Sequence, residues 1–421
     1  MTARLHTLSN GVRVVADPIP GLESFALSVV VRGGARWEPA ERNGWSHLLE
    51  HMVFKGAGAR SAQAIVEMVE ADGGWINAAT GWERTSFQVR GLAGRLPSAT
   101  AVLADLLRRP VLDPAELQRE KGVIGQEIAE AADTPDDRVF DLAQGRAFAD
   151  QGLGRPILGD DAALAPATRE TLAAWHAGLY LDPRRIVVSA AGAVDEAELL
   201  RLVEEALGDL AAPDGGLPEP EPARFTGGAL AEARKLEQAH LVLLVPGVGV
   251  RDPAWHAQRL FAEVLGGGMA SRLFQEAREK RGLAYAVDAY SESYEDAGLL
   301  GVYAGASAAD ARPLAELVDA ELRKLADRVE PAELARAKAQ SRGQAAMARE
   351  QPLHRAEQAA AQALLFDRLI APEELAAGVE AVDAAALRDY GARLLSAPAR
   401  AAAVLGPKRA GAAAEAFLQA A

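Results

Sequence analysis

The sequence predicts an α+β protein of two homologous domains, each a β-sheet with helices packed on it. Apolar runs of strand length alternate with longer helical patterns, a proline-rich stretch interrupts them near the middle, and the same order of elements then returns. The 421 residues, 49% of them hydrophobic, are enough for more than one core. We therefore expect an N-terminal domain at residues 1–212, a linker at 213–228 and a C-terminal repeat domain at 229–421.

Periodicity and turn residues define the elements of the first half. Apolar or alternating runs predict strands at residues 12–16, 25–31, 75–80, 84–90 and 186–191. Helical patterns cover residues 41–55, 61–71, 96–109, 114–132, 136–149, 169–179 and 195–207. Asp113 and Pro114 mark a helix start, because an aspartate caps free backbone N–H groups and proline suits the first turn.

The second half repeats this order. Strands are expected at residues 240–245, 284–290 and 299–303, and helices at 255–265, 271–280 and 311–326. Leu260 matches Leu48 at an offset of 212, and the Pro-Ala-Glu-Leu that begins at Pro114 recurs from Pro331 at an offset of 217. A nearly constant offset is the signature of a duplicated unit.

The stretch from His47 to His51, His-Leu-Leu-Glu-His, carries the strongest indication of function. At about 100° per residue, His47 and His51 lie about 40° apart on a helix, so both rings can reach one metal ion. Neutral imidazole is a favoured zinc ligand, and Glu50 is placed to accept a proton from water at such a site. The alternative is two unrelated core or surface histidines, a chance match expected in on the order of one in a hundred sequences of this composition.

Two carboxylates further along the chain can complete such a site. Glu120 and Glu127 are seven residues apart, so both project from one face of a helix. One of them can be the third ligand, whereas the alternative is a solvated acidic stripe that includes Glu116 and Glu130. The second half of the chain lacks these two histidines and three glutamates at the corresponding positions. The aligned pairs are His47 with Arg259, Glu50 with Ala262, His51 with Glu263, Glu120 with Ala337 and Glu127 with Gln344.

Composition excludes several classes of site and partner. The chain has no cysteine, so a metal must be held by nitrogen and oxygen. A net charge of -14 argues against nucleic acid; it would suit basic peptides, although a solubilising acidic surface is the commoner explanation. Residues 1–15 lack a signal-peptide pattern and no apolar run has the length of a membrane span, so we expect a cytoplasmic protein that does not bind membranes.

Together these residues resemble the pitrilysin/insulinase family of zinc metallopeptidases, the inverzincins, in which His-x-x-Glu-His replaces His-Glu-x-x-His. The resemblance covers nearly the whole chain and implies the metallohydrolase fold of the processing peptidases and LuxS-like proteins. Glu120 and Glu127 stand where the family has a Glu-x6-Glu pair. The resemblance therefore implies one Zn²⁺ per chain, held by His47, His51 and Glu127, with Glu50 as the base and Glu120 orienting a ligand histidine.

Two other segments resemble parts of the family that contact substrate. The stretch from Asn77 to Thr80 is similar to the edge strand along which a peptide substrate lies, which makes Asn77, Ala79 and Thr80 candidates for substrate contacts. Arg278 and Tyr285 match an Arg-x6-Tyr pair that helps to hold the substrate and to stabilise the reacting carbonyl. Without the resemblance, they would be interpreted as a surface arginine and a core tyrosine.

The family also builds a chamber from four copies of one α+β unit, and this chain supplies two. The resemblance therefore implies a homodimer in which Arg278 and Tyr285 reach the zinc site of the partner chain. We expect a zinc-dependent endopeptidase that hydrolyses peptides or unfolded segments inside a two-subunit chamber. The alternatives are a non-catalytic assembly subunit and a catalytic subunit that needs a different partner chain.

Overall fold

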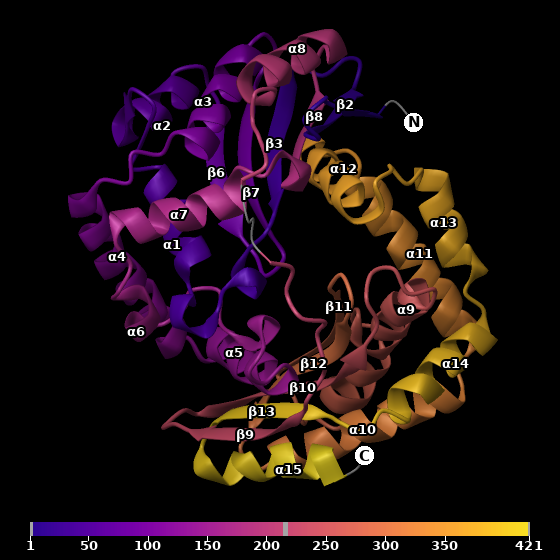
Figure 1. Ribbon diagram of the computed structural model, residues 1–421. Helices are drawn as coiled ribbons and strands as arrows, with labels where there is room; N and C mark the ends of the chain where they lie inside the picture. The colour runs from indigo at the N-terminus through magenta and orange to yellow at the C-terminus, as the bar shows by residue number, and fades with distance from the viewer. Residues whose placement is uncertain (1–2, 214–217, 420–421) are drawn as a thin grey trace. The chain divides into compact units, whose positions relative to one another are not determined.

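The computed structural model describes residues 3–213 and 218–419, and the chain divides into two compact units of interleaved segments (Figure 1). The first unit comprises Met1–Ile128, Pro156–Pro220 and Ala345–Pro372. The second comprises Ala129–Arg155, Glu221–Gln344 and Glu373–Ala421. None of the helices in the described residues is both long and apolar enough to cross a membrane.

A six-stranded sheet forms the centre of the first unit. Its order is β1 (Arg4–Thr7), β2 (Arg13–Pro18), β8 (Ile186–Gly192), β3 (Ser24–Arg32), β7 (Arg84–Leu92) and β6 (Trp75–Thr80), so β6 is an edge strand. The helices of its N-terminal segments are α1 (Trp45–Val53), α2 (Ala62–Glu70), α3 (Leu96–Arg108), α4 (Pro114–Asp133), α6 (Asp161–Leu164), α7 (Arg169–Tyr180) and α8 (Glu196–Leu207). A short hairpin, β4 (Gly56–Ala57) and β5 (Arg60–Ser61), follows α1.

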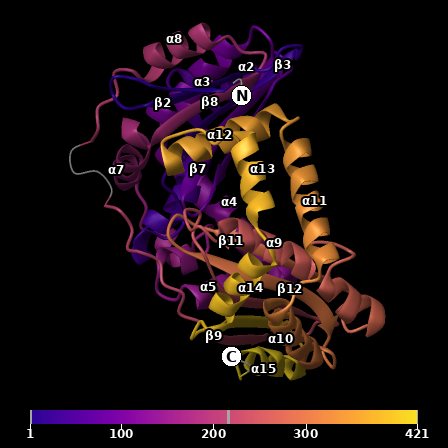
Figure 2. The same ribbon diagram turned by 90° about the vertical axis from the view of Figure 1, so that its right-hand side faces the viewer.

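The other face of this sheet is covered by α12 (Pro352–Phe366), which lies beside it in Figure 2. Ala360 and Ala363 are fully buried against Val15, Val30 and Val187. Small alanine side chains let the helix backbone approach the strands closely. With both faces covered, β3 is buried along nearly all its length, which explains its continuous apolar run.

The second unit has a sheet of matching topology. Its order is β11 (Ala286–Ser293), β12 (Gly298–Ser307), β10 (Gln238–Gly247), β13 (Ala401–Gly406) and β9 (Gly228–Ala233). In both sheets an edge hairpin is followed by a central antiparallel pair and then by one parallel pair, β8 with β2 and β13 with β9. The predicted α+β class with two homologous domains is therefore confirmed.

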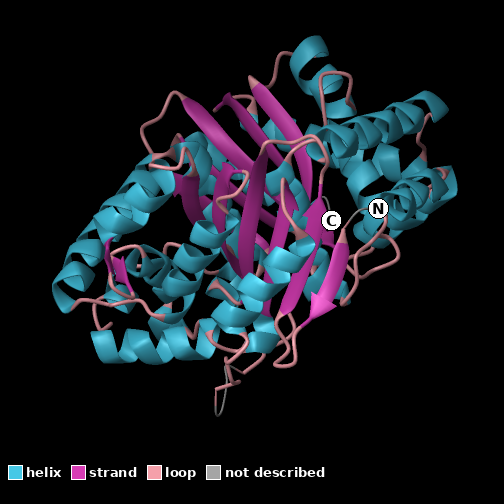
Figure 3. Ribbon diagram, turned by 90° about the horizontal axis from the view of Figure 1, so that it is seen from above, coloured by secondary structure: helices cyan, strands magenta, loops and turns pink. Residues whose placement is uncertain are grey.

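Helices cover this second sheet as they do the first, and Figure 3 shows helices flanking the strands. One face packs on α9 (Trp255–Gly266), α10 (Ala311–Asp327), α14 (Ala384–Leu395) and α15 (Ala412–Gln419). On the other, α5 (Pro135–Ala147) contacts β10 and β13. This part of the chain also contains α11 (Pro331–Ala348), α13 (Pro372–Ala381) and the π-helix η5 (Phe274–Lys280).

The compact units differ from the contiguous domains expected at residues 1–212 and 229–421. Residues 129–155, which include α5, belong to the second unit, and residues 345–372, which include α12, belong to the first. Periodicity shows that a helix has an apolar face but not which sheet that face covers, so the exchange leaves no local signal. The connection between Pro220 and Glu221 does fall within the predicted linker, of which residues 214–217 lie outside the described residues.

Two predicted helices differ from the expectation. The helix predicted at residues 41–55 begins at Trp45, because Gly44 has a φ of 88° and the short 3-10 turn Ala40–Arg42 precedes it. The helix predicted at residues 271–280 is helical from residue 272, but Phe274–Lys280 form a π-helix. A π-helix has wider turns than an α-helix because its backbone hydrogen bonds join residues five apart, and the apolar pattern of the sequence does not distinguish the two.

Candidate metal centre

Helix α1 presents two histidines on the side that faces away from the core. Leu48, Leu49 and Met52 are fully buried, which fixes the rotation of the helix. His47 and His51, one turn apart, therefore lie together on the opposite side with their ring centroids 4.6 Å apart. Their side chains are 12% and 19% exposed, so both remain accessible to a small ion.

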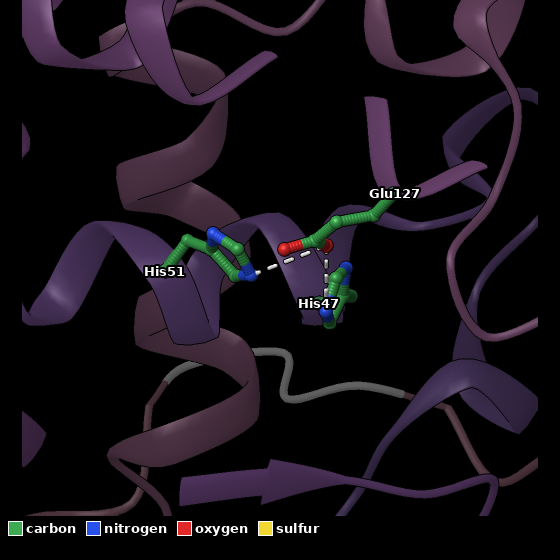
Figure 4. Close-up of side chains that lie close together, drawn as sticks. All are labelled: His47, His51 and Glu127. Atoms are coloured by element: carbon green, nitrogen blue, oxygen red, sulfur yellow. Dashed lines mark ion pairs between the residues drawn. The ribbon is translucent and has the colours of Figure 1, made fainter. Parts of the chain in front are cut away.

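Glu127 of α4 completes a group of three ligands (Figure 4). Its Oε2 lies 3.8 Å from Nε2 of His47 and 3.6 Å from Nε2 of His51, and the ligand atoms all lie within 4.8 Å of one another. Two ligand atoms of a tetrahedral zinc ion are about 3.3 Å apart, since each is about 2.0–2.1 Å from the metal. Only a small side-chain adjustment would let the three groups share one ion, and no other such group is found in the described parts of the chain.

The second carboxylate of α4 contacts His51 from behind. Glu120 is nearly buried, and its Oε2 lies 3.0 Å from Nδ1 of His51. Its other oxygen pairs with the ammonium group of Lys55 at 2.8 Å. A carboxylate that accepts a hydrogen bond from the Nδ1–H group keeps the proton on Nδ1, so the lone pair of Nε2 is directed at Glu127. This geometry supports the orienting role that the family resemblance implies for Glu120.

Glu50 lies on α1 between the two histidines in sequence and is held by the edge strand β6. The hydroxyl of Thr80 donates to Oε2 of Glu50 at 2.5 Å. Burial raises the pKa of the Glu50 carboxyl, an effect that the Thr80 hydrogen bond and the charge of His51 partly oppose. A carboxylate with a raised pKa is a better proton acceptor than one in water.

The environment of His47 favours the neutral imidazole that binds metal. Burial, together with the charge of His51, lowers the pKa of His47 from 6.5 to about 4. Its Nδ1 is buried and has no hydrogen-bond partner among the described residues, while Nε2 faces Glu127. Two neutral imidazoles and one carboxylate form a donor set that fits zinc better than magnesium or calcium.

We expect the metal-free protein to lose stability between pH 7 and pH 5 because of His47. In the unfolded chain this histidine takes up a proton below its ordinary pKa of 6.5, but in the folded protein only near pH 4. The unfolded state therefore binds more protons in this window, and His47 costs about 2 kcal/mol of folding free energy at pH 5.

Urea unfolding in the presence of a chelator, compared with His47→Gln, measures this effect. The variant lacks the titrating ring, so its stability relative to wild type should rise by about 2 kcal/mol on going from pH 7 to pH 5. Titrating groups that do not interact with His47 are common to both proteins and cancel in the difference. Parallel pH profiles would contradict the lowered pKa of His47.

The structure separates the three predicted substrate residues of β6. This strand pairs with β7 alone among the described strands, so one edge of its backbone is open. Asn77 and Ala79 are exposed and alternate with Ala78, which packs into the core on the side of α1. Thr80 shares the face of Ala78 and contacts Glu50, whereas Asn77 and Ala79 point to the opposite face.

Arg278 and Tyr285 belong to the second unit, so the structure does not place them in the three-ligand group of the first. Arg278 lies on the π-helix with its guanidinium 4.9 Å from the centroid of the Phe274 ring. Tyr285 precedes β11 and is 65% exposed, while its backbone N–H donates to the carbonyl of Gly305. The alternative interpretation of Tyr285 as a core residue is therefore wrong, and the contact of both residues with substrate stays a prediction.

Sequence reasoning missed Lys55 and Glu38. Lys55 follows His51 by four residues, a spacing that indicates the same helix face, so a signal for it was present. Glu38 is 1% exposed and accepts hydrogen bonds from the backbone N–H groups of Gly44 at 2.8 Å and Ser46 at 2.6 Å. It satisfies the free N–H groups at the start of α1 from outside the usual capping position, which no local pattern predicts.

Two models of known protein families match this chain. The family model described as Insulinase (Peptidase family M16) matches residues 13–161, the segment that carries His47, His51 and Glu127. A second model, described as Peptidase M16 inactive domain, matches residues 166–341. The match to an inactive domain agrees with the absence of the ligand set from the second half of the sequence.

Individual relatives extend over most of the chain. An uncharacterized zinc protease of Rickettsia bellii is 33% identical over 401 residues, which cover 95% of this chain and 96% of that protein. The uncharacterized zinc protease YmxG of Bacillus subtilis is 38% identical over 341 residues, or 80% of this chain and 82% of that protein. Among solved structures, a protease from Helicobacter pylori has a TM-score of 0.89 at 19% identity, covering 96% of this chain and 99% of that one, which shows a common fold.

Proposed function

Because this chain belongs to the insulinase family of peptidases, peptidase family M16, we propose that it is a zinc-dependent endopeptidase acting on peptides or unfolded polypeptide segments. The observation that carries the proposal is the convergence of His47, His51 and Glu127 on one point, with the carboxylate of Glu50 on the same helix as both histidines. This arrangement contains both a site for a metal ion and a separate base.

Each residue of the centre has a distinct part in hydrolysis. Nε2 of His47, Nε2 of His51 and the Glu127 carboxylate would hold Zn²⁺, which polarises the scissile carbonyl and lowers the pKa of water. Glu50 accepts the proton of the attacking water and returns it to the leaving amine. Thr80 fixes the orientation of the Glu50 carboxylate, and Glu120 fixes that of the His51 ring.

The open edge of β6 is the proposed docking site for the substrate backbone. A peptide that pairs with this edge gains main-chain hydrogen bonds whatever its sequence, and Asn77 and Ala79 lie along the strand to contact it. The net charge of -14 would favour basic peptides by long-range attraction. Equal turnover of acidic and basic peptides at low salt would contradict that preference.

We expect the purified chain to contain one equivalent of zinc and to cleave a quenched fluorogenic peptide. Dialysis against a chelator should remove both metal and cleavage, and added Zn²⁺ should restore both. The match of the second half to an inactive domain makes a non-catalytic assembly subunit the rival. A chain that holds no zinc and cleaves nothing would favour that rival and contradict the peptidase.

A homodimer is the proposed assembly, with Arg278 and Tyr285 of one chain serving the metal centre of the other. Glu50→Gln and Tyr285→Phe should each reduce activity in separate preparations. In a mixture with exchanging subunits, half of the dimers are mixed and each has one intact site, so activity should return to about a quarter of wild type. A monomer by light scattering, or a mixture without any gain, would contradict shared sites.

A further inference from the structure

The metal ligands come from two helices that are far apart in sequence, and something must set the distance between them. His47 and His51 lie on α1, a helix of nine residues, whereas Glu127 lies on α4, a helix of twenty. Zinc ligands must be placed to within about 0.5 Å. The ion pairs of Glu120 join α4 to His51 of α1 and to Lys55, which follows the end of that helix.

Residues 156–167, named here the bridging segment, contact the start of α1. Nδ2 of Asn43 donates to the carbonyl of Pro156 and Nε1 of Trp45 to that of Ala163, both at 2.9 Å. Between them the backbone at Gly44 is packed so tightly that a Cβ atom there would lie 2.6 Å from the carbonyl oxygen of Leu158. The first turn of α1 is thus held against this segment by hydrogen bonds on both sides of a direct backbone contact.

The same segment is bound to α4 at its other end. Nζ of Lys121 donates to the carbonyl oxygens of Ala165 and Ala167, each at 2.7 Å. These carbonyls follow α6 (Asp161–Leu164), where free carbonyl groups at a helix end favour a cation. Lys121 adjoins Glu120 and precedes Glu127 by six residues, so its hydrogen bonds act on the part of α4 that carries both carboxylates.

We propose that the bridging segment sets the separation of the two metal-binding helices, with Trp45 and Lys121 as positioning residues at its two ends. The proposal rests on the proposed function only in that His47, His51 and Glu127 bind the metal. Loss of either contact loosens the separation of the two helices, and the ligand atoms then spend less time at the distance that zinc requires. The effect is therefore on metal affinity and coordination geometry first, and on hydrolysis through them.

Variants that weaken the contact of the bridging segment with α1, with α4 or with both test this inference. Trp45→Phe keeps an aromatic ring but removes the N–H donor, and Lys121→Met keeps the length of the side chain but removes the ammonium group. Zinc affinity is measured by competition with a chromophoric chelator, and coordination by the visible spectrum of the Co²⁺ protein. We expect each single variant to bind zinc about tenfold more weakly, as for other groups that orient metal ligands.

The double variant should bind zinc little more weakly than the weaker single variant, because weakening either contact already interrupts the link through residues 156–167. Lys121→Arg retains donors for both carbonyls and should restore affinity and the Co²⁺ spectrum. Arg119→Met is the matched control, since Arg119 lies on α4 with an exposed side chain that pairs with Glu116. Thermal unfolding of the metal-free variants separates a general loss of stability from a specific loss of metal binding.

Three results would overturn the inference: unchanged zinc affinity in both single variants, losses that multiply in the double variant, or an unchanged Co²⁺ spectrum with affinity falling only in step with metal-free stability. A wild-type chain that binds zinc but cleaves no peptide would refute the proposed function and leave this test intact. A wild-type chain that binds no zinc would refute both.

Discussion

Glu50→Gln is expected to keep its zinc and to lose peptide hydrolysis by about 10²–10⁴-fold, the usual effect of removing a general base. Glutamine has nearly the same shape as glutamate, and its side-chain oxygen can still accept the hydrogen bond from Thr80. The amide cannot take up the proton of the attacking water. Because Glu50 is not among the three ligands, the metal content should not change.

Metal analysis and the turnover number with a fluorogenic peptide, measured on the same preparation, check this prediction. Glu70→Gln at the exposed end of α2 is a matched control and should retain full activity. A Glu50→Gln variant that remains active would remove the assigned base. A variant that has lost its zinc would show instead that Glu50 contributes to metal binding.

Glu127→Gln should lower zinc affinity more than about 100-fold, because it replaces a charged ligand, whereas loss of a group that only orients a ligand costs about 10–100-fold. Activity should fall with metal occupancy and return partly when zinc is added in excess. Glu120→Gln separates the two carboxylates of α4. It should weaken zinc binding within that smaller range, since the glutamine oxygen can still accept from Nδ1 of His51 but the negative charge that strengthens this hydrogen bond and pairs with Lys55 is lost.

Isothermal titration, or competition with a chelator of known affinity, measures both constants. Glu130→Gln, on the same helix and exposed, serves as the control and should bind zinc as wild type does. If Glu120→Gln loses more affinity than Glu127→Gln, the ligand assignment of the two carboxylates is reversed. If neither loses affinity, the metal is held elsewhere.

Much of this centre could be predicted from the amino-acid sequence, because its chemistry is encoded locally. His47, Glu50 and His51 lie within about one turn of a helix. Burial of Leu48 and Leu49 fixes the rotation of that helix and so the side on which the histidines lie. The pairing of Glu120 with Glu127 follows in the same way from two turns of α4. That Glu127 meets the histidines could be expected only through the family resemblance, since no local rule relates α1 to α4.

Several features were decided by tertiary structure alone. The sequence predicts that Thr80 contacts the substrate. In the structure, the pleat of β6 directs its hydroxyl toward Glu50 and away from the face of Asn77. In the sequence, Lys121 is one of several charged residues on a polar helix. In the structure, its ammonium group donates to two backbone carbonyls more than forty positions further along the chain. Such contacts depend on where separate elements meet, which helical and strand periods do not specify.

The sequence by itself determined the fold class, the internal repeat, the family and the residue types of a metal centre confined to the first half. Hydrophobic periodicity and residue spacing are properties of a single helix or strand. They can be recognised in the sequence because each element buries one face. Only the tertiary structure decided that α5 and α12 exchange sheets, that α1 begins at Trp45, and that residues 156–167 contact both α1 and α4. These depend on packing between distant segments, where the free energy comes from contacts that neither segment makes alone.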